Sequence, residues 1–181
     1  MRSLANRIVQ LFASILICGI VVTVAVPATV QQEAITATVI GEMIQKVGYR
    51  AMIQKQAIMY NLAGYARNDP DGTVGVMLQG DKERIDKTLE AISAGNKNSS
   101  KANIVGVSPA TLDSNLKTFT IFSWTSKSRN ITSPYDLVFN LRAADNEISL
   151  KEADAVWNTI AETALKGEDL AKFMKHLKDE E

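Results

Sequence analysis

Apolar residues in the first half of this chain change repeatedly between the two-residue period of a strand and the longer period of a helix. Ile35, Ala37 and Val39 alternate with polar or small residues, which indicates a half-buried strand. After Gly48 the apolar residues fall close to helical spacing, and Gly64 is expected to end that helix. The sequence therefore predicts a strand, a loop and a helix whose N-terminus points at the loop.

A hairpin and a second helix are expected next. The segment 69–72 reads Asp-Pro-Asp-Gly, a turn signal in which proline fixes φ and glycine accepts a positive φ. The two strands joined by this turn are expected at residues 65–68 and 73–79. Asp81 is placed to cap a helix that runs to Ala94 with its apolar residues on one face. Residues 104–107 and 119–122 supply the last strands.

The order strand, helix, strand, strand, helix, strand is the split βαβ arrangement of ferredoxin-like folds. This is an α+β architecture, an antiparallel sheet with two helices on one face. The loop after the first strand and the turn after the second strand lie close together in it. Arg50, at the start of the first helix, and Asn68, at the end of the second strand, are therefore expected to face one ligand.

The residues at these two places resemble the motifs of the acylphosphatase family. The segment 45–50, Gln-Lys-Val-Gly-Tyr-Arg, is similar to the family loop Gly-x-Val-Gln-Gly-Val-x-Phe/Tyr-Arg. The segment 64–72 is similar to the second family motif, Gly-Trp/Tyr-Val-x-Asn-x-x-x-Gly. Three further segments, around 72–80, 81–94 and 119–124, follow in the family's order and spacing, so the resemblance covers residues 35–126.

This resemblance implies hydrolysis of the carboxyl–phosphate bond of a small acyl phosphate, with Arg50 binding the phosphate and Asn68 orienting the attacking water. An acyl phosphate already carries a good leaving group, so the reaction needs charge neutralisation and an aligned water, and no cofactor or metal. Backbone N–H groups at the start of the helix are expected to bind the other phosphate oxygens. The residues of this phosphate-binding loop are Ile44, Gln45, Lys46, Val47, Gly48 and Tyr49.

Two positions depart from the family loop. Lys46 stands where the family usually has glycine, and Glu42 stands where the other loop glycine is common, although Gly41 is next to it. Loop glycines permit a positive φ and a close approach of the backbone to the phosphate. The alternative function is therefore a catalytically inactive domain of the same fold that serves as a binding or assembly module.

Residues 1–28 have the form of an export signal. A basic start is followed by an apolar run from Ile8 to Val26, and Val-Pro-Ala at 26–28 suits cleavage after Ala28. The apolar run is also long enough for an uncleaved membrane anchor. Either reading predicts a bacterial protein that is periplasmic, secreted or anchored in the inner membrane. The single cysteine, Cys18, lies within this leader, so no disulfide is expected after it.

The chain has 181 residues, enough for one compact domain with extensions. Residues 127–181 are expected to form a C-terminal extension with a strand at 137–141 and a helix opened by the capping box Ser149 to Glu152. Apolar residues between Leu150 and Leu165 form a stripe that packs on the domain, or that binds a protein partner or a second copy. Gly167 is expected to break this helix before a short second amphipathic helix.

Formal charges are balanced, with 20 Lys and Arg against 20 Asp and Glu, so nothing favours a nucleic acid partner.

Overall fold

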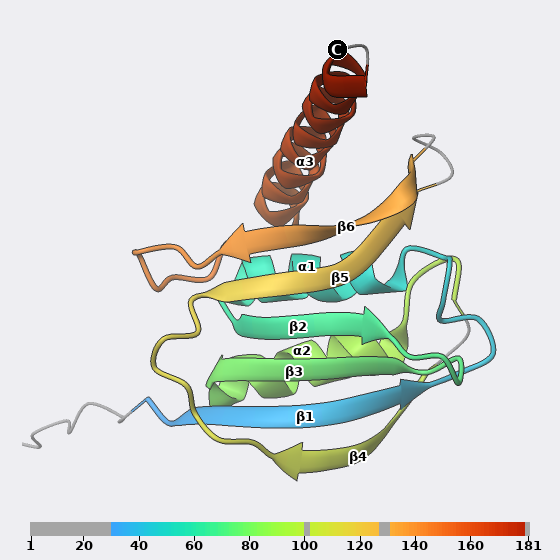
Figure 1. The fold of residues 1–181 in the computed structure, drawn as a ribbon. Helices are drawn as coiled ribbons and strands as arrows, with labels where there is room; N and C mark the ends of the chain where they lie inside the picture. Colours follow the sequence, from blue (N-terminus) through green and yellow to red (C-terminus); the bar gives the residue numbers. More distant parts are fainter. Residues whose placement is uncertain (1–29, 100–101, 127–130, 180–181) are drawn as a thin grey trace, which may run out of the picture.

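The structure is a computed structural model that describes residues 30–99, 102–126 and 131–179. Six strands form one sheet in the order β4-β1-β3-β2-β5-β6 (Figure 1). They are β1 (Gln32–Ile40), β2 (Ala63–Asn68), β3 (Val74–Asp81), β4 (Asn103–Pro109), β5 (Thr118–Ser126) and β6 (Ile131–Asn140). Neighbouring strands are antiparallel except β2 and β5, which are parallel.

The helices α1 (Tyr49–Tyr60) and α2 (Lys82–Ala94) lie together on one face of the sheet (Figure 1). The first six elements thus follow the predicted order, and the expected ferredoxin-like α+β fold is confirmed. Strand β5 is an addition to the central four strands, and it runs parallel to β2 because the chain crosses between β4 and β5 from one side of the sheet to the other.

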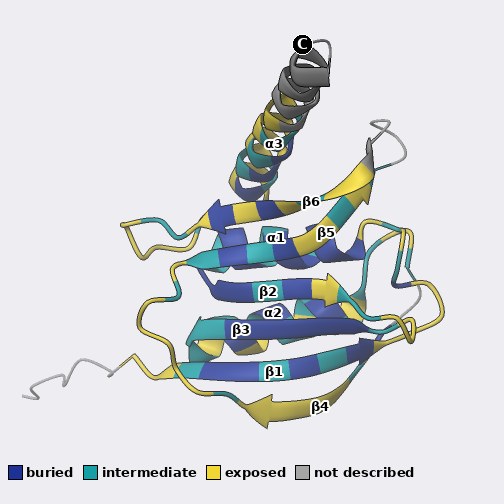
Figure 2. Ribbon diagram, viewed as in Figure 1, coloured by how far each residue is buried: buried dark blue, intermediate teal, exposed yellow. Residues whose placement is uncertain are grey.

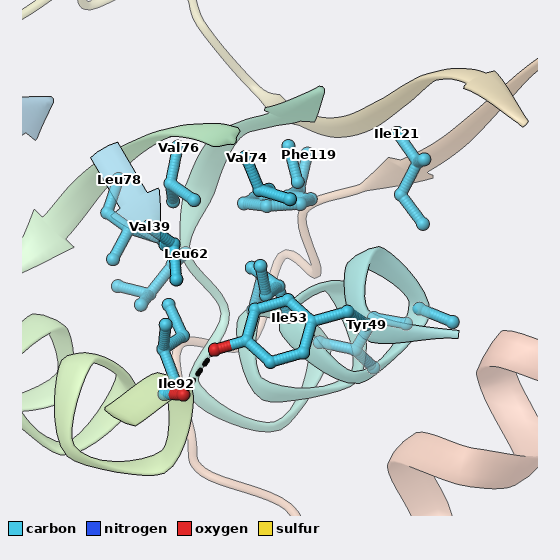
Figure 3. Packing of buried hydrophobic residues seen from close by; sticks show 14 of the residues in the cluster. Val39, Tyr49, Ile53, Leu62, Val74, Val76, Leu78, Ile92, Phe119 and Ile121 are labelled. Carbon is cyan, nitrogen blue, oxygen red and sulfur yellow. Dashed lines mark hydrogen bonds between the residues drawn. The ribbon is translucent and has the colours of Figure 1, made fainter. Parts of the chain in front are cut away.

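The main core lies between the sheet and these two helices. Ile35, Ala37 and Val39 on β1 are buried there, as their alternation predicts. Figure 2 shows that buried residues dominate the central strand β3. Apolar side chains from the strands meet α1 and α2 side chains such as Ile53 and Ile92 (Figure 3). The backbone N–H of Arg84 donates to Asp81 Oδ1 at 3.2 Å, which confirms the expected cap of α2.

The predicted end of the first helix is wrong. Helix α1 ends at Tyr60, and Asn61 caps it in the left-handed conformation with a φ of 55°. Gly64 instead lies within β2, at a φ of 138°, where a Cβ atom would stand 1.9 Å from the carbonyl oxygen of Met77. Glycine is needed here because β2 and β3 approach closely. In the sequence alone, this glycine is interpreted as the end of the preceding helix.

The C-terminal part of the chain belongs to the same sheet and core. Strand β6 pairs with β5, and a single helix, α3 (Leu150–Asp179), follows. Glu152 Oε2 accepts hydrogen bonds from both the N–H and the hydroxyl of Ser149, at 2.8 and 2.7 Å, so the predicted capping box is present. The expected break at Gly167 is wrong, because one glycine inside a helix costs only about 1 kcal/mol and need not interrupt it.

The apolar stripe of α3 packs on the domain over its N-terminal half. Ala153, Trp157 and Ala161 are buried in the same core as α1 and β6. Lys55 on α1 forms an ion pair with Asp154 on α3, with 2.8 Å between Nζ and Oδ1. The rest of α3 projects past the edge of the sheet (Figure 1).

Residues 1–28, for which an export signal or anchor is expected, lie outside the described residues. In the part of the chain that is described, none of the helices combines the length and apolar character that a membrane-spanning segment requires.

Candidate functional site

The loop between β1 and α1 ends in a backbone conformation that suits glycine. Gly48 has a φ of 77° and ψ of 16°, and its carbonyl accepts the N–H of Met52 at 3.1 Å, the first bond of α1. A Cβ atom at Gly48 would meet nothing within 4 Å. Glycine is therefore favoured here by its positive φ, since other residues pay about 1–2 kcal/mol for this conformation.

Polar side chains hold this loop in place. Gln45 Nε2 donates to the carbonyl oxygens of Asp69, at 3.0 Å, and Thr73, at 2.7 Å, and so joins the loop to the β2–β3 turn. Asn96, after α2, donates to the carbonyl of Val47 at 3.3 Å. The side chain of Gln45 is thus structural. The loop and the turn that carries Asn68 are fixed as one unit.

Lys46 occupies the left-handed region with a φ of 64° and is exposed. The departure from the family loop therefore falls at a position where a residue with a Cβ atom is strained. Glu42 is exposed as well, and it does not line the cavity described below.

Replacing Lys46 by glycine is expected to raise the free energy of unfolding by about 0.5–1 kcal/mol, because the strain at a positive φ is relieved. Chemical denaturation measures this change. Lys97→Gly is the matched control, because it removes the same charge from an exposed loop position without a positive φ. Equal destabilisation by both substitutions would contradict strain at Lys46.

Tyr49, the first residue of α1, is a structural residue. Its side chain is buried and its hydroxyl donates to the carbonyl of Ile92 on α2 (Figure 3). Burial raises the pKa of Tyr49 from 10.0 to about 12. The phenol therefore stays protonated at neutral pH and ties the start of α1 to the end of α2.

This raised pKa predicts a loss of stability in alkali. The unfolded chain ionises Tyr49 near pH 10.0 while the folded chain holds the proton to about 12, so the contribution is complete below pH 10 and is lost between these values. The loss is expected to be on the order of 2 kcal/mol. Denaturation curves between pH 9 and 12 test this, and Tyr49→Phe should reduce the pH dependence. An unchanged pH dependence in Tyr49→Phe would exclude Tyr49 as its source.

Arg50 is the second residue of α1, and its side chain is 8% exposed. Its guanidinium donates to the carbonyls of Phe122 and Ser123 on β5; Nη1 and Nη2 lie 3.4 and 3.5 Å from the Ser123 oxygen. Burial lowers its pKa, yet an arginine remains charged in proteins. Nε takes part in no hydrogen bond among the described residues, so the Nε–Nη2 edge can bind two phosphate oxygens.

The carbonyls that hold Arg50 are presented by a bulge in β5. The register with β6 shifts between Ile121 and Trp124, and Ser123 has a φ of 51°. Asp136 on β6 stabilises the bulge, because its Oδ1 accepts the N–H of Ser123 at 2.9 Å. Sequence reasoning missed Ser123 and Asp136, since no local pattern marks a bulge between strands.

Asn68 is the last residue of β2 and pairs with Val74 across the hairpin. Its Oδ1 atom is buried and has no hydrogen-bond partner among the described residues. A buried acceptor without a partner costs about 1–3 kcal/mol, so native proteins seldom keep one without a reason. This oxygen therefore keeps its capacity to accept a hydrogen bond.

Arg50 and Asn68 line one cavity of about 610 Å³. The rest of its wall comes from the predicted loop, from β5 and from the loop after α2, namely Ile44, Lys46, Val47, Gly48, Tyr49, Asn98, Ser123, Trp124, Thr125 and Ser126. A second hollow of about 460 Å³ also includes Arg50, Asn68 and Ser123, together with Tyr65, Arg67 and Phe122. Of the residues expected in the site, only Gln45 is not part of the cavity wall.

The charge of this cavity suits an anion. Lys46 and Arg50 line it, no Asp or Glu does, and the N-terminus of α1 adds a partial positive charge. Within the described residues, no group of His, Cys, Asp and Glu is arranged to hold a metal ion. The arrangement can neutralise a phosphate and place a water beside it.

These features define a ferredoxin-like domain with an anion site where a helix begins. The sequence model of the acylphosphatase family matches residues 35–121. The acylphosphatase of Chlorobaculum tepidum is 38% identical over 66 residues, which are 36% of this chain and 72% of that protein. This chain belongs to the acylphosphatase family.

Other relatives match over a shorter span. The acylphosphatase of Methanocella arvoryzae is 48% identical over 52 residues, which are 29% of this chain and 59% of that protein. The match to the acylphosphatase of Colwellia psychrerythraea is 52% identical over 52 residues and covers 58% of it. The crystal structure of an acylphosphatase from Bacillus subtilis has 24% identity and a TM-score of 0.43, over 48% of this chain and 94% of that one. The chain thus spans under two thirds of the first two relatives.

Proposed function

We propose that this protein hydrolyses the carboxyl–phosphate bond of a small acyl phosphate. The phosphate binds at the start of α1, where the Arg50 guanidinium and the backbone N–H groups of the loop neutralise its charge. Asn68 accepts a hydrogen bond from a water and so directs the water's lone pair at phosphorus. The water oxygen forms a bond to phosphorus, and the bond from phosphorus to the acyl oxygen breaks so that its electron pair stays on the leaving carboxylate. One proton of the water passes to a phosphate oxygen.

The observation that supports this proposal most strongly is the buried Oδ1 of Asn68, which has no hydrogen-bond partner among the described residues, on a residue that lines the same cavity as Arg50. A purely structural asparagine at the end of a strand would normally satisfy its buried oxygen. A site for an anion and a water explains both residues at once. The family membership supports the same chemistry.

An inactive binding or assembly module is the second candidate. Lys46 strains the loop, and Arg50 already donates to carbonyls of β5, so both could weaken phosphate binding. In this case the projecting part of α3 is the surface for a protein partner or a second copy.

Hydrolysis of acetyl phosphate and benzoyl phosphate by the purified full-length chain separates the two candidates. The proposal expects release of phosphate well above the buffer rate, with competitive inhibition by inorganic phosphate. An inactive module would leave the buffer rate unchanged.

We further propose that the domain works outside the cytoplasm of a bacterium, because residues 1–28 combine a basic start with an apolar run. Cleavage after Ala28 would release a chain that begins at Thr29. Cell fractionation with N-terminal sequencing tests this; an uncleaved chain in the membrane fraction would support an anchor, and a cytoplasmic chain would contradict export.

A further inference from the structure

A third hollow, here called the acyl groove, adjoins the cavity that Arg50 and Asn68 line. The acyl groove has a volume of about 670 Å³ and shares Val47, Gly48, Asn98, Trp124 and Ser126 with that cavity. The two spaces therefore have a common wall at the start of α1. Asn68 and Arg50 line the cavity and do not line the groove, so the groove extends away from the point where the water is placed.

The acyl groove runs along one face of α1 towards α3. Ala51, Met52 and Lys55 line it from α1, and Trp157 lines it from α3. From Gly48 to Lys55 the helix rises by about 10 Å, at about 1.5 Å per residue. This length exceeds that of an acetyl group.

Both tryptophans of the chain stand in the wall of the groove. The rings of Trp124 and Trp157 meet edge to face with 5.8 Å between their centroids, and the Arg50 guanidinium carbon lies 5.7 Å from the centre of the Trp124 ring. At the far end, Lys55 Nζ is 2.8 Å from Asp154 Oδ1 and 5.0 Å from the centre of the Trp157 ring. The charges at the far end compensate one another. The wall formed by α1 and the two tryptophans is largely aromatic and aliphatic, and the loop after α2 adds a polar side with Lys97.

We propose that the acyl groove holds the acyl group of the substrate, and that the physiological substrate is an acyl phosphate with a bulky apolar acyl group, such as an aromatic ring. This inference rests on the proposed function, because a phosphate at Arg50 fixes where the acyl group begins. A water held by Asn68 attacks phosphorus from one side, and the carboxylate leaves on the opposite side, towards the groove. Trp157 lies on α3, beyond the matched residues 35–121, so the wall that α3 adds to the groove belongs to this chain rather than to the shared motifs.

The kinetic test compares benzoyl phosphate with acetyl phosphate. The ratio of their kcat/KM values is expected to be at least about tenfold in favour of benzoyl phosphate, the scale of one added apolar group in a fitted pocket. Ala94, the last residue of α2, is exposed and lines the groove, so Ala94→Phe should fill it and lower that ratio by at least about fivefold. Ala155→Phe is the matched control, because Ala155 is an exposed α3 residue outside the groove.

A binding test does not depend on turnover. Benzoylphosphonate and acetylphosphonate cannot be hydrolysed, and because both tryptophans line the groove, tryptophan fluorescence reports on its occupant. We expect tighter binding of benzoylphosphonate in the parent and in Ala155→Phe, and loss of this preference in Ala94→Phe.

The two tests separate the inference from the proposed function. Hydrolysis without a preference for the benzoyl compounds, or a preference that Ala94→Phe leaves intact, overturns the acyl groove and leaves the hydrolase. Preferential binding of benzoylphosphonate without any hydrolysis supports the groove and overturns the hydrolase. Absence of both hydrolysis and phosphonate binding overturns both.

Discussion

Replacing Arg50 by glutamine is expected to weaken acyl phosphate turnover and inhibition by inorganic phosphate together, with kcat/KM falling on the order of 100- to 1,000-fold. The substitution removes the charge and the paired N–H groups that bind phosphate oxygens in both the substrate and the transition state. Steady-state kinetics with inorganic phosphate as competitor measures both effects.

Arg50 also joins α1 to the bulge of β5, so its loss affects stability as well. Arg50→Lys is the matched variant, because it keeps the charge and loses the planar pair of donors. We expect it to keep part of the phosphate inhibition that Arg50→Gln loses. If folded Arg50→Gln, checked by circular dichroism, is inhibited by phosphate as strongly as the parent, Arg50 does not bind the anion.

Replacing Asn68 by alanine is expected to lower kcat on the order of 100-fold while inhibition by inorganic phosphate survives. The substitution removes the side-chain amide whose oxygen positions the water, and the phosphate ligands at Arg50 and the loop stay in place. Arg50→Gln is therefore expected to lose inhibition by phosphate and Asn68→Ala to keep it. A general loss of folding would remove it in both variants.

Asn98→Ala provides the control for this prediction. Asn98 lines the same cavity from the loop after α2 and is exposed, so its amide should contribute little to turnover. A value of kcat in Asn68→Ala equal to that of Asn98→Ala would show that Asn68 does not orient the water.

The parts of the fold that depend on neighbouring residues in sequence could be predicted. Alternation at Ile35, Ala37 and Val39 reports burial of one strand face, and Asp81 and Ser149 cap helices through bonds to residues three positions away. The prediction at Gly64 is wrong, because a sequence does not distinguish a glycine that a close neighbouring strand requires from a glycine that ends a helix.

The features of the site that come from distant parts of the chain could not be predicted. The bulge at Ser123 depends on Asp136, and the contact of Trp124 with Trp157 depends on how α3 returns to the domain. Neither relation has a sequence period or a motif. The motifs did place Arg50 and Asn68 at one cavity, because the split βαβ topology brings a loop and a turn together wherever these elements form.

The C-terminal extension contributes residues to the surroundings of the site. In the described structure, Asp136 of β6 stabilises the bulge whose carbonyl oxygens accept hydrogen bonds from Arg50. Helix α3 supplies one wall of the acyl groove. Both elements lie outside the part of the chain that matches the family. Under our proposal, the shared part of the fold binds the phosphate, and the extension surrounds the acyl group.

Hydrolysis of benzoyl phosphate in water labelled with heavy oxygen tests the central claim most directly. If Arg50 holds the phosphate and Asn68 directs a water at phosphorus, phosphate release will exceed the buffer rate and the label will appear in the inorganic phosphate. Enzyme-dependent label in the benzoate would instead show attack at the acyl carbon. Either that result or the absence of any release above the buffer rate would contradict the account.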